Sequence, residues 1–178
     1  ARKSKTMLSK EQEKWVNHLS NDSKIRIVPF DPTSQERFER LESKIRLKLG
    51  GSVRVEHHGA SSLGISGQDE IDVYLPVPPS HFDELVAMMT ELFGEPRSCY
   101  PLERVRFKTY EDEKRIDLFV INEESSGWLN GLRFEEHLKS HPKALEEYRE
   151  LKESCDGLGT QEYYRRKIEF INSILVKT

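Results

Sequence analysis

Long hydrophobic runs are missing from this sequence of 178 residues. No apolar run approaches the roughly 20 residues that a membrane-spanning helix needs, so we expect no membrane partner. The basic N-terminal segment lacks the apolar stretch of a secretory signal, so we do not interpret it as one. Cysteine is scarce too, because only Cys99 and Cys155 occur, far apart and outside any metal-ligand or redox pattern. Idle thiols are typical of a reducing compartment, which predicts a cytoplasmic protein.

A large excess of one charge is absent as well. The formal net charge is −3, which argues against broad electrostatic capture of nucleic acid. The composition is 35% hydrophobic and 33% charged, as expected of a globular protein with a heavily solvated surface. The length suits one domain with a core of its own.

Internal repeats and low-complexity linkers are absent, so hydrophobic spacing is the guide to the fold. Helical spacing and capping signals predict helices over residues 10–21, 33–49, 81–94, 125–141, 142–155 and 160–178. Alternating apolar residues predict strands over residues 24–30, 53–56, 71–77, 103–111 and 114–121, the last two as a hairpin. The pattern indicates an α+β fold, a small mixed β-sheet packed with helices and followed by a helical C-terminal third.

The same pattern suggests where the parts of the chain begin and end. We expect an N-terminal helical extension over residues 1–22 and one domain over residues 23–178. Within that domain, the sheet core covers about residues 23–122 and the C-terminal helices cover about residues 126–177.

Two predicted strands carry carboxylates on the side away from the core. Side chains alternate along a strand, so burying Ile71, Val73 and Leu75 puts Glu70 and Asp72 on the opposite face. The segment "RIDLFV" places Asp117 in the same way. If the strands are neighbours, Asp72 and Asp117 converge, and clustered carboxylates call for a divalent cation such as Mg²⁺ or Mn²⁺. The alternative is that they are surface acids paired with arginines, and that Glu70 is an edge-of-strand acid.

A glycine–serine segment precedes these acids. Gly59, Ser61 and Ser62 offer small hydroxyls and an unhindered backbone, which suit phosphate oxygens. A strand, a glycine–serine loop and acids from two strands fit metal-assisted nucleotidyl or phosphoryl transfer. The alternative is a mobile surface loop.

Basic side chains alternate along the strand predicted over residues 103–111. Arg104, Arg106 and Lys108 face one side, since Val105 and Phe107 face the other. They either form a solvated face or contact a triphosphate or an anionic acceptor. For His57 and His58 beside the loop, we expect a structural hydrogen bond rather than metal ligation.

These motifs resemble known proteins. The segments "HGASS", "EIDVYL" and "RIDLFV" resemble the nucleotidyltransferase superfamily, whose pattern runs from a glycine–serine turn to an acid–apolar–acid strand and a distal acid. More narrowly, "HHGASSLGISGQDEIDVY" and "RFEEHLKSHPKALEEYRELK" resemble the GrpB-like family of predicted nucleotidyltransferases. The resemblance runs from about Ile25 to the C-terminus and implies a nucleotidyltransferase-like fold for the domain over residues 23–178.

The resemblance implies roles for particular residues. The GrpB-like frame makes Asp72 the first metal acid and leaves Tyr74 where a second acid would stand, whereas the superfamily frame pairs Glu70 with Asp72. In both frames, Asp117 is the distal acid. In the C-terminal helix, the family match implies a phosphate-binding Lys167 and a base-stacking Tyr163.

Taken together, the residues and the resemblance predict a metal-dependent nucleotidyltransferase that binds a nucleoside triphosphate with Mg²⁺ (or Mn²⁺). The catalytic and metal-binding residues are Glu70, Asp72 and Asp117, and the nucleotide-binding residues are Gly59, Ser61, Ser62, Arg106, Tyr163 and Lys167. The acceptor is unknown: a small molecule, a protein or RNA. The alternative function is a catalytically inactive module of the same fold that binds a nucleotide, an anion or a protein partner.

Overall fold

The computed structural model describes residues 7–178, so the first six residues of the predicted N-terminal extension lie outside the described residues. The chain divides into two compact units. The sheet unit comprises residues 30–65 and 69–129, and the helical unit comprises residues 7–29, 66–68 and 130–178. None of the helices in residues 7–178 has both the length and the apolar character that crossing a bilayer requires.

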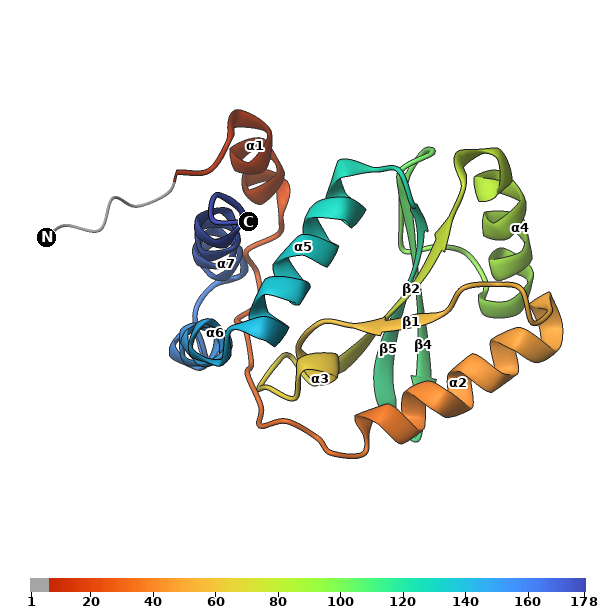
Figure 1. Cartoon of the computed structure of the whole chain (residues 1–178), viewed down its shortest axis with the longest axis horizontal. Coiled ribbons are helices and arrows are strands. Elements are labelled where there is room, and N and C mark those ends of the chain that lie inside the picture. The colour runs from red at the N-terminus through yellow and green to blue at the C-terminus, as the bar shows by residue number, and fades with distance from the viewer. Residues whose placement is uncertain (1–6) are drawn as a thin grey trace, which may run out of the picture. The chain divides into compact units, whose positions relative to one another are not determined.

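One mixed β-sheet forms the centre of the sheet unit, as predicted for an α+β fold (Figure 1). Its strands are β1 (Glu56–His58), β2 (Glu70–Val77), β3 (Ser98–Tyr100), β4 (Arg104–Glu111) and β5 (Lys114–Asn122). Their order across the sheet is β1-β2-β5-β4-β3. Strands β2 and β5 run parallel, whereas the other neighbouring pairs are antiparallel. The two strands that carry the predicted acids are therefore direct neighbours.

Two helices and the apolar face of this sheet form the core. Helix α2 (Ser34–Leu49) and helix α4 (Phe82–Phe93), which follows a short 3₁₀ turn η1 (Pro79–His81), bring apolar stripes to it. The sheet contributes the residues that alternation predicted, namely Ile71, Val73, Leu75, Val105, Phe107, Ile116, Leu118 and Val120. Burial of this continuous apolar surface supplies the main driving force for folding the unit. The opposite face of β2 and β5 carries Glu70, Asp72 and Asp117.

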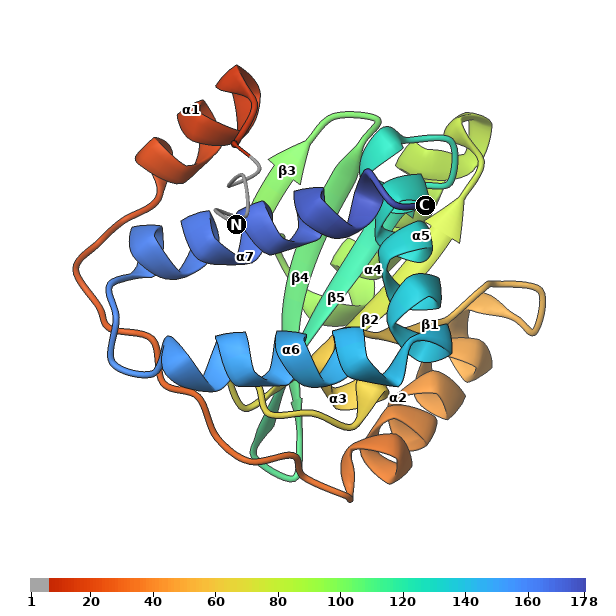
Figure 2. The same cartoon turned by 60° about the vertical axis from the view of Figure 1, so that its left-hand side comes forward.

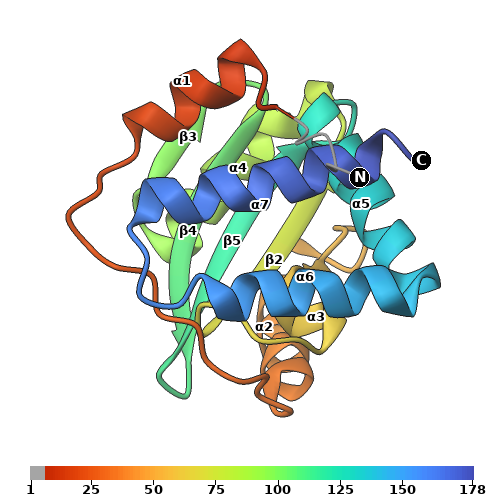
Figure 3. The same ribbon diagram turned by 90° about the vertical axis from the view of Figure 1, so that its left-hand side faces the viewer.

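The helical unit is built on α1 (Lys10–His18), α6 (Pro142–Ser154), α7 (Thr160–Leu175) and most of α5 (Ser126–Ser140), which begins in the sheet unit. Figures 2 and 3 show α6 and α7 lying side by side. Phe134, Tyr148 and Phe170 bring α5, α6 and α7 together through aromatic contacts. Trp15 of α1 packs edge-on against Tyr164 of α7, with 5.4 Å between the ring centroids.

Two predicted strands are wrong in position or kind. Residues 24–30 form no strand and make only isolated bridges, from Lys24 to Gly159 and from Val28 to Gly67. The strand predicted over residues 53–56 begins only at Glu56. Before that point, Arg46 donates hydrogen bonds to the carbonyls of Gly51 and Val53, so a side chain takes the place of a partner strand.

The glycine–serine segment contains regular structure that the sequence did not predict. It contains a single helical turn, α3 (Ala60–Leu63), between Gly59 and Gly64, both of which have positive φ. The N–H groups of Ser62 and Leu63 donate to the Gly59 carbonyl at 3.1 Å. The segment is therefore a compact helical turn bounded by two glycines.

Candidate metal centre

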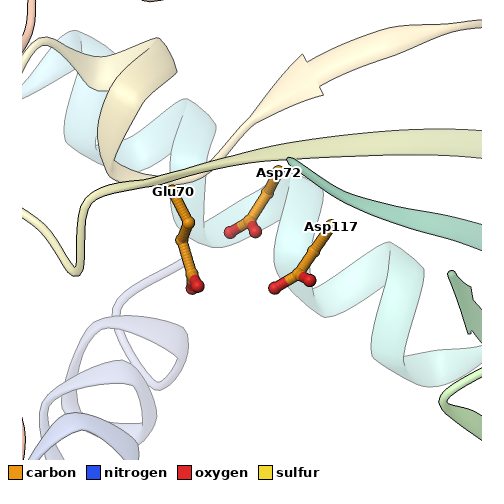
Figure 4. A group of neighbouring side chains, drawn as sticks. All are labelled: Glu70, Asp72 and Asp117. Carbon is orange, nitrogen blue, oxygen red and sulfur yellow. The ribbon is translucent and has the colours of Figure 1, made fainter. Parts of the chain in front are cut away.

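Three carboxylates meet on the sheet face that lies away from the core. Glu70 and Asp72 project from β2 and Asp117 projects from β5, and Figure 4 shows the three side chains directed toward one another. One carboxylate oxygen from each lies within 4.8 Å of the other two. All three belong to the sheet unit.

Strand register explains this convergence. Asp72 pairs with Asp117 across the parallel β2–β5 ladder, so the two side chains leave neighbouring positions on the same face. Glu70 lies two residues before Asp72 and therefore shares that face. Tyr74, two residues after Asp72, instead stacks on Phe119 with 4.6 Å between the ring centroids. The acid that joins Asp72 on this strand is thus Glu70, as in the superfamily frame. At the position where the GrpB-like frame would place a second acid, Tyr74 contributes an aromatic ring instead.

Gly59 brings the preceding turn against the acids. Its φ of +78° is a conformation that favours glycine, and a Cβ atom built there would lie 2.7 Å from Asp72 Oδ2. The absence of a side chain at Gly59 therefore lets the backbone approach the carboxylate closely. Of the predicted phosphate-binding residues, Gly59 thus lies against the acid cluster.

Arginines partly neutralise the cluster. Arg115 donates to both oxygens of Asp117, from Nε at 3.2 Å and from Nη2 at 3.1 and 3.2 Å. Its Nε lies 3.8 Å from Glu70 Oε2, and Arg106 Nη1 lies 3.7 Å from Asp117 Oδ1. Burial tends to lower the pKa of Arg115, but the neighbouring charges of Asp117 and Glu70 outweigh it and raise that pKa. The alternative of arginine-paired acids is therefore realised in part, with Arg115 as the principal partner.

The two histidines beside the turn, His57 and His58, contact other side chains of the sheet unit. His57 Nε2 lies 2.7 Å from Ser61 Oγ, and His57 Nδ1 lies 3.0 Å from Gln35 Oε1. His57 is thus engaged in structural hydrogen bonds, as expected. The ring of His58 packs edge-on against Tyr74 and Trp128.

The basic side chains of β4 follow the predicted alternation but separate in their contacts. Arg104 lies over the rings of Tyr100 and Phe119, at 5.5 and 5.7 Å from their centroids. Lys108 lies opposite Asp117 in the register, yet its ammonium is 5.4 Å from the centroid of the Tyr110 ring. Of these three basic residues, Arg106 forms an ion pair with the acid cluster, since its Nη1 lies within 4 Å of Asp117.

Tyr163 and Lys167, the predicted base-stacking and phosphate-binding residues, belong to α7 of the helical unit. Tyr163 is buried, and its hydroxyl lies 3.1 Å from the ammonium of the buried Lys152. Burial raises the pKa of the Tyr163 phenol well above its ordinary range. Lys167 lies 6.0 and 5.5 Å from the ring centroids of Tyr163 and Tyr164. Within its own unit, Tyr163 therefore has a packing role that the sequence pattern did not reveal.

The donor set suits a hard divalent cation. Mg²⁺ binds oxygens at 2.0–2.1 Å, which keeps its ligand atoms within about 4.2 Å of one another. The carboxylate oxygens, all within 4.8 Å of one another, need only a small inward adjustment to reach that spacing. The three acids thus fit a single Mg²⁺ or Mn²⁺ ion.

Sequence reasoning overlooked two features of this face. Arg115 precedes Asp117 by two residues on a strand, and this spacing puts both on one face. That spacing was the signal for their ion pair. The aromatic cluster of Tyr74, Phe119 and Trp128 had a weaker signal, because Trp128 comes from the start of α5 and no local pattern links it to β2.

Comparisons with known proteins agree with this architecture. A family model described as GrpB protein matches residues 24–177. A UPF0157 protein of Vibrio cholerae is 26% identical over 157 residues, which cover 79% of this chain and 77% of the relative. The crystal structure of the conserved protein GrpB from Enterococcus faecalis superposes with a TM-score of 0.66 and 19% identity, over 85% of this chain and 95% of that one. At this identity, the superposition shows a shared fold.

Proposed function

Because the chain belongs to the GrpB protein family, whose motifs resemble nucleotidyltransferases, we propose that it is a metal-dependent nucleotidyltransferase acting on a nucleoside triphosphate. The observation that carries the proposal is the meeting of Glu70, Asp72 and Asp117 beside the close approach of Gly59. Structural stability alone gives little reason to place three carboxylates together, since like charges on one sheet face repel. A divalent cation gives such a reason.

In this proposal the three acids hold one Mg²⁺ or Mn²⁺ ion. A bound divalent cation orients the phosphates and neutralises charge on them as it develops. An acceptor hydroxyl attacks the α-phosphorus in line and loses its proton to solvent. A new phosphate ester bond forms as the bond between the α- and β-phosphates breaks, and pyrophosphate is released. Asp72 is central to the arrangement, because it lies between Glu70 on its own strand and Asp117 on the next. Asp117 is the most deeply buried of the three, and it is held in place by Arg115.

The nucleotide contacts in this proposal come from residues around the acids. Ser61 is held by His57, and Gly59 keeps the turn against Asp72. Arg106 lies beside Asp117 and offers a guanidinium, which suits phosphate oxygens. We retain Ser62 as a proposed contact on the sequence resemblance, whereas Tyr163 and Lys167 of the helical unit stay predictions from the sequence. The N–H of Ser62 is occupied within its own turn, so a contact from Ser62 would use the hydroxyl.

The decisive experiment is metal-dependent ligand binding. A thermal-shift panel of nucleoside triphosphates, with and without Mg²⁺, is expected to show stabilisation only when both are present. Asp72→Asn keeps the shape of the side chain but removes its charge, and it is expected to abolish this effect. Unchanged metal-dependent binding by this variant would refute the assignment.

Asp69→Asn is the matched control. Asp69 directly precedes the cluster and pairs with Lys114 rather than with the three acids. It has a positive φ of 63°, a conformation that asparagine tolerates as well as aspartate does. We expect this variant to retain the metal-dependent shift. Loss of the shift in both variants would mean that general acidity of the region, not the cluster, causes binding.

The second candidate is an inactive module of the same fold that binds an anion or a protein partner. The ion pair between Arg115 and Asp117 favours it, since an acid already neutralised by an arginine has less need of a metal. A flat nucleotide panel with and without Mg²⁺ would support this module over the enzyme.

A further inference from the structure

Arg115 occupies a particular place beside the proposed metal centre. It is the register partner of Glu70 across the β2–β5 ladder, and it lies two residues before Asp117 on the same face of β5. Its guanidinium makes three hydrogen bonds of 3.1–3.2 Å to Asp117 and comes within 3.8 Å of Glu70. One positive group thus spans two of the three acids.

The hydrogen bonds of Arg115 and a divalent cation require the same oxygens. Both carboxylate oxygens of Asp117 accept from Arg115, and metal ligation uses the lone pairs of such oxygens. Two positive groups also repel each other at this distance. Arg115 in its observed position and a cation bound by Asp117 therefore compete.

Resting on the proposed function, we propose that Arg115 is a switch residue, which neutralises Glu70 and Asp117 before a divalent cation binds and then turns to the polyphosphate of the substrate. In the first position its charge limits the repulsion among the acids. In the second position its planar guanidinium donates two hydrogen bonds to phosphate oxygens. Cation binding then precedes tight polyphosphate binding.

The surroundings of Arg115 allow this movement. Its side chain is 37% exposed, whereas that of its partner Asp117 is 6% exposed. The arginine therefore has a route to solvent, while the aspartate stays in place. Arg106 is less suited to the role, because it makes one long contact of 3.7 Å to Asp117, with no contact to Glu70 within the ion-pair range.

The charge balance gives the switch its direction. The guanidiniums of Arg115 and Arg106 offset part of the negative charge of the acid cluster. A divalent cation adds two positive charges to the same site, which favours release of a guanidinium from the acids. A polyphosphate carries several negative charges, so it binds better once that guanidinium is available.

The test is to measure Mn²⁺ binding to the full chain without nucleotide, by following the electron paramagnetic resonance signal of free Mn²⁺. Arg115→Gln removes the competing group, and we expect it to bind Mn²⁺ about tenfold more tightly than the unmodified protein. In the presence of saturating Mg²⁺, the same variant is expected to bind inorganic tripolyphosphate about tenfold more weakly, because one charge-assisted contact is lost. The opposite signs of the two effects distinguish a switch from a merely structural arginine.

Arg54→Gln is the matched control, since Arg54 also bridges two carboxylates, Glu56 and Glu123, elsewhere in the sheet unit. We expect it to leave both affinities unchanged. If Arg115→Gln folds poorly, Arg115→Lys keeps the charge but loses the fork that spans both oxygens of Asp117, and it too is expected to bind Mn²⁺ more tightly than the unmodified protein.

The outcomes separate this proposal from the proposed function. If the unmodified protein binds Mn²⁺ and neither Arg115 variant binds it more tightly, the switch is refuted and the metal centre stands. Tighter Mn²⁺ binding with unchanged tripolyphosphate binding also overturns the switch, because the released arginine then has no role with the anion. If neither the unmodified protein nor the Arg115 variants bind Mn²⁺, the metal centre itself is wrong.

Discussion

Asp72 and Asp117 are register partners on two neighbouring parallel strands, and their carboxylates meet with Glu70 on one face of the sheet. Like charges placed directly across a ladder destabilise a sheet. Arg115 and Arg106 offset part of this cost in the structure. A local violation of the rules for stable sheets is characteristic of functional sites, where stability is given up for chemistry. This relationship is the strongest physical reason to look for a ligand here.

Replacing Gly59 with alanine is expected to disturb this site directly. The new Cβ would lie 2.7 Å from Asp72 Oδ2 and would also force alanine into a φ of +78°. We expect the free energy of unfolding to fall by about 1–2 kcal/mol and Mn²⁺ affinity to fall with it. Chemical denaturation and Mn²⁺ titration measure the two effects.

Gly64→Ala provides the control for backbone strain. Gly64 has a similar φ of +72°, but a Cβ there meets no atom within 4 Å. We expect it to lower stability without changing Mn²⁺ affinity. Equal losses of Mn²⁺ affinity in the two variants would show that strain in the turn, and not contact with Asp72, is responsible.

Much of the sheet unit could be predicted from the sequence, because two strong periodic signals coincide there. Alternation along β2, β4 and β5 identified the core residues and the opposite face, and the buried Ile71, Leu118 and Phe107 confirm that assignment. The helices α2, α4, α6 and α7 had capping and stop signals near their observed ends. Local pattern determines such elements, and their burial reinforces it.

The sequence predicted that the acids converge only if the two strands that carry them are neighbours in the sheet. Alternation places Asp72 and Asp117 each on one face of its own strand, but it does not say which strands are neighbours. That adjacency depends on the parallel β2–β5 pairing, in which paired residues are 45 positions apart in the sequence, and no local signal encodes such a contact. Register decided the question, and register is a property of the folded sheet.

The errors have the same origin. Residues 24–30 have the extended, apolar pattern of a strand, but a strand exists only where a partner strand is available, and here Val28 finds a single bridge to Gly67. The turn α3 is too short for any helical period to emerge, so its sequence was indistinguishable from a loop.

Replacing Tyr163 with phenylalanine is expected to destabilise the helical unit. The hydroxyl of Tyr163 accepts a hydrogen bond from the ammonium of Lys152, and both side chains are buried. Its removal leaves a buried charge with one partner fewer, so we expect the free energy of unfolding to fall by about 1–3 kcal/mol. Urea denaturation at neutral pH measures this loss.

A double-mutant cycle with Lys152→Met tests the origin of that loss. If the hydrogen bond is responsible, Tyr163→Phe costs much less stability in the Lys152→Met background, because the charge that needed the hydroxyl is gone. Equal losses in both backgrounds would assign the effect to the space that the missing hydroxyl leaves in the core, since phenylalanine keeps the ring.

Asp31 gives the protein a stability that depends on pH. Its carboxylate accepts from the hydroxyl and the N–H of Thr33, at 2.7 and 2.9 Å, and lies 3.0 Å from the ammonium of Lys114. The hydrogen bonds from Thr33, followed by that from Lys114, hold the pKa of Asp31 well below its ordinary value of 3.8. The folded state therefore favours the ionised form more strongly than the unfolded state does.

A lowered pKa stabilises the folded protein wherever the unfolded carboxyl is ionised, so the contribution is complete above pH 3.8 and is lost as the pH falls toward the lower folded pKa. Asp31→Asn is expected to be less stable than the unmodified protein at pH 7, by up to about 1 kcal/mol for a pair that solvent reaches in part. The difference should shrink steadily below pH 3.8, because the unmodified protein alone then takes up a proton on unfolding.

Thr33→Val removes the hydroxyl donor and should raise the pKa of Asp31 in a carbon-detected NMR titration of its carboxyl group. A stability difference between Asp31→Asn and the unmodified protein that stays constant from pH 7 to strongly acidic pH would contradict this account, since it would mean that the charge of Asp31 contributes nothing and only its shape matters.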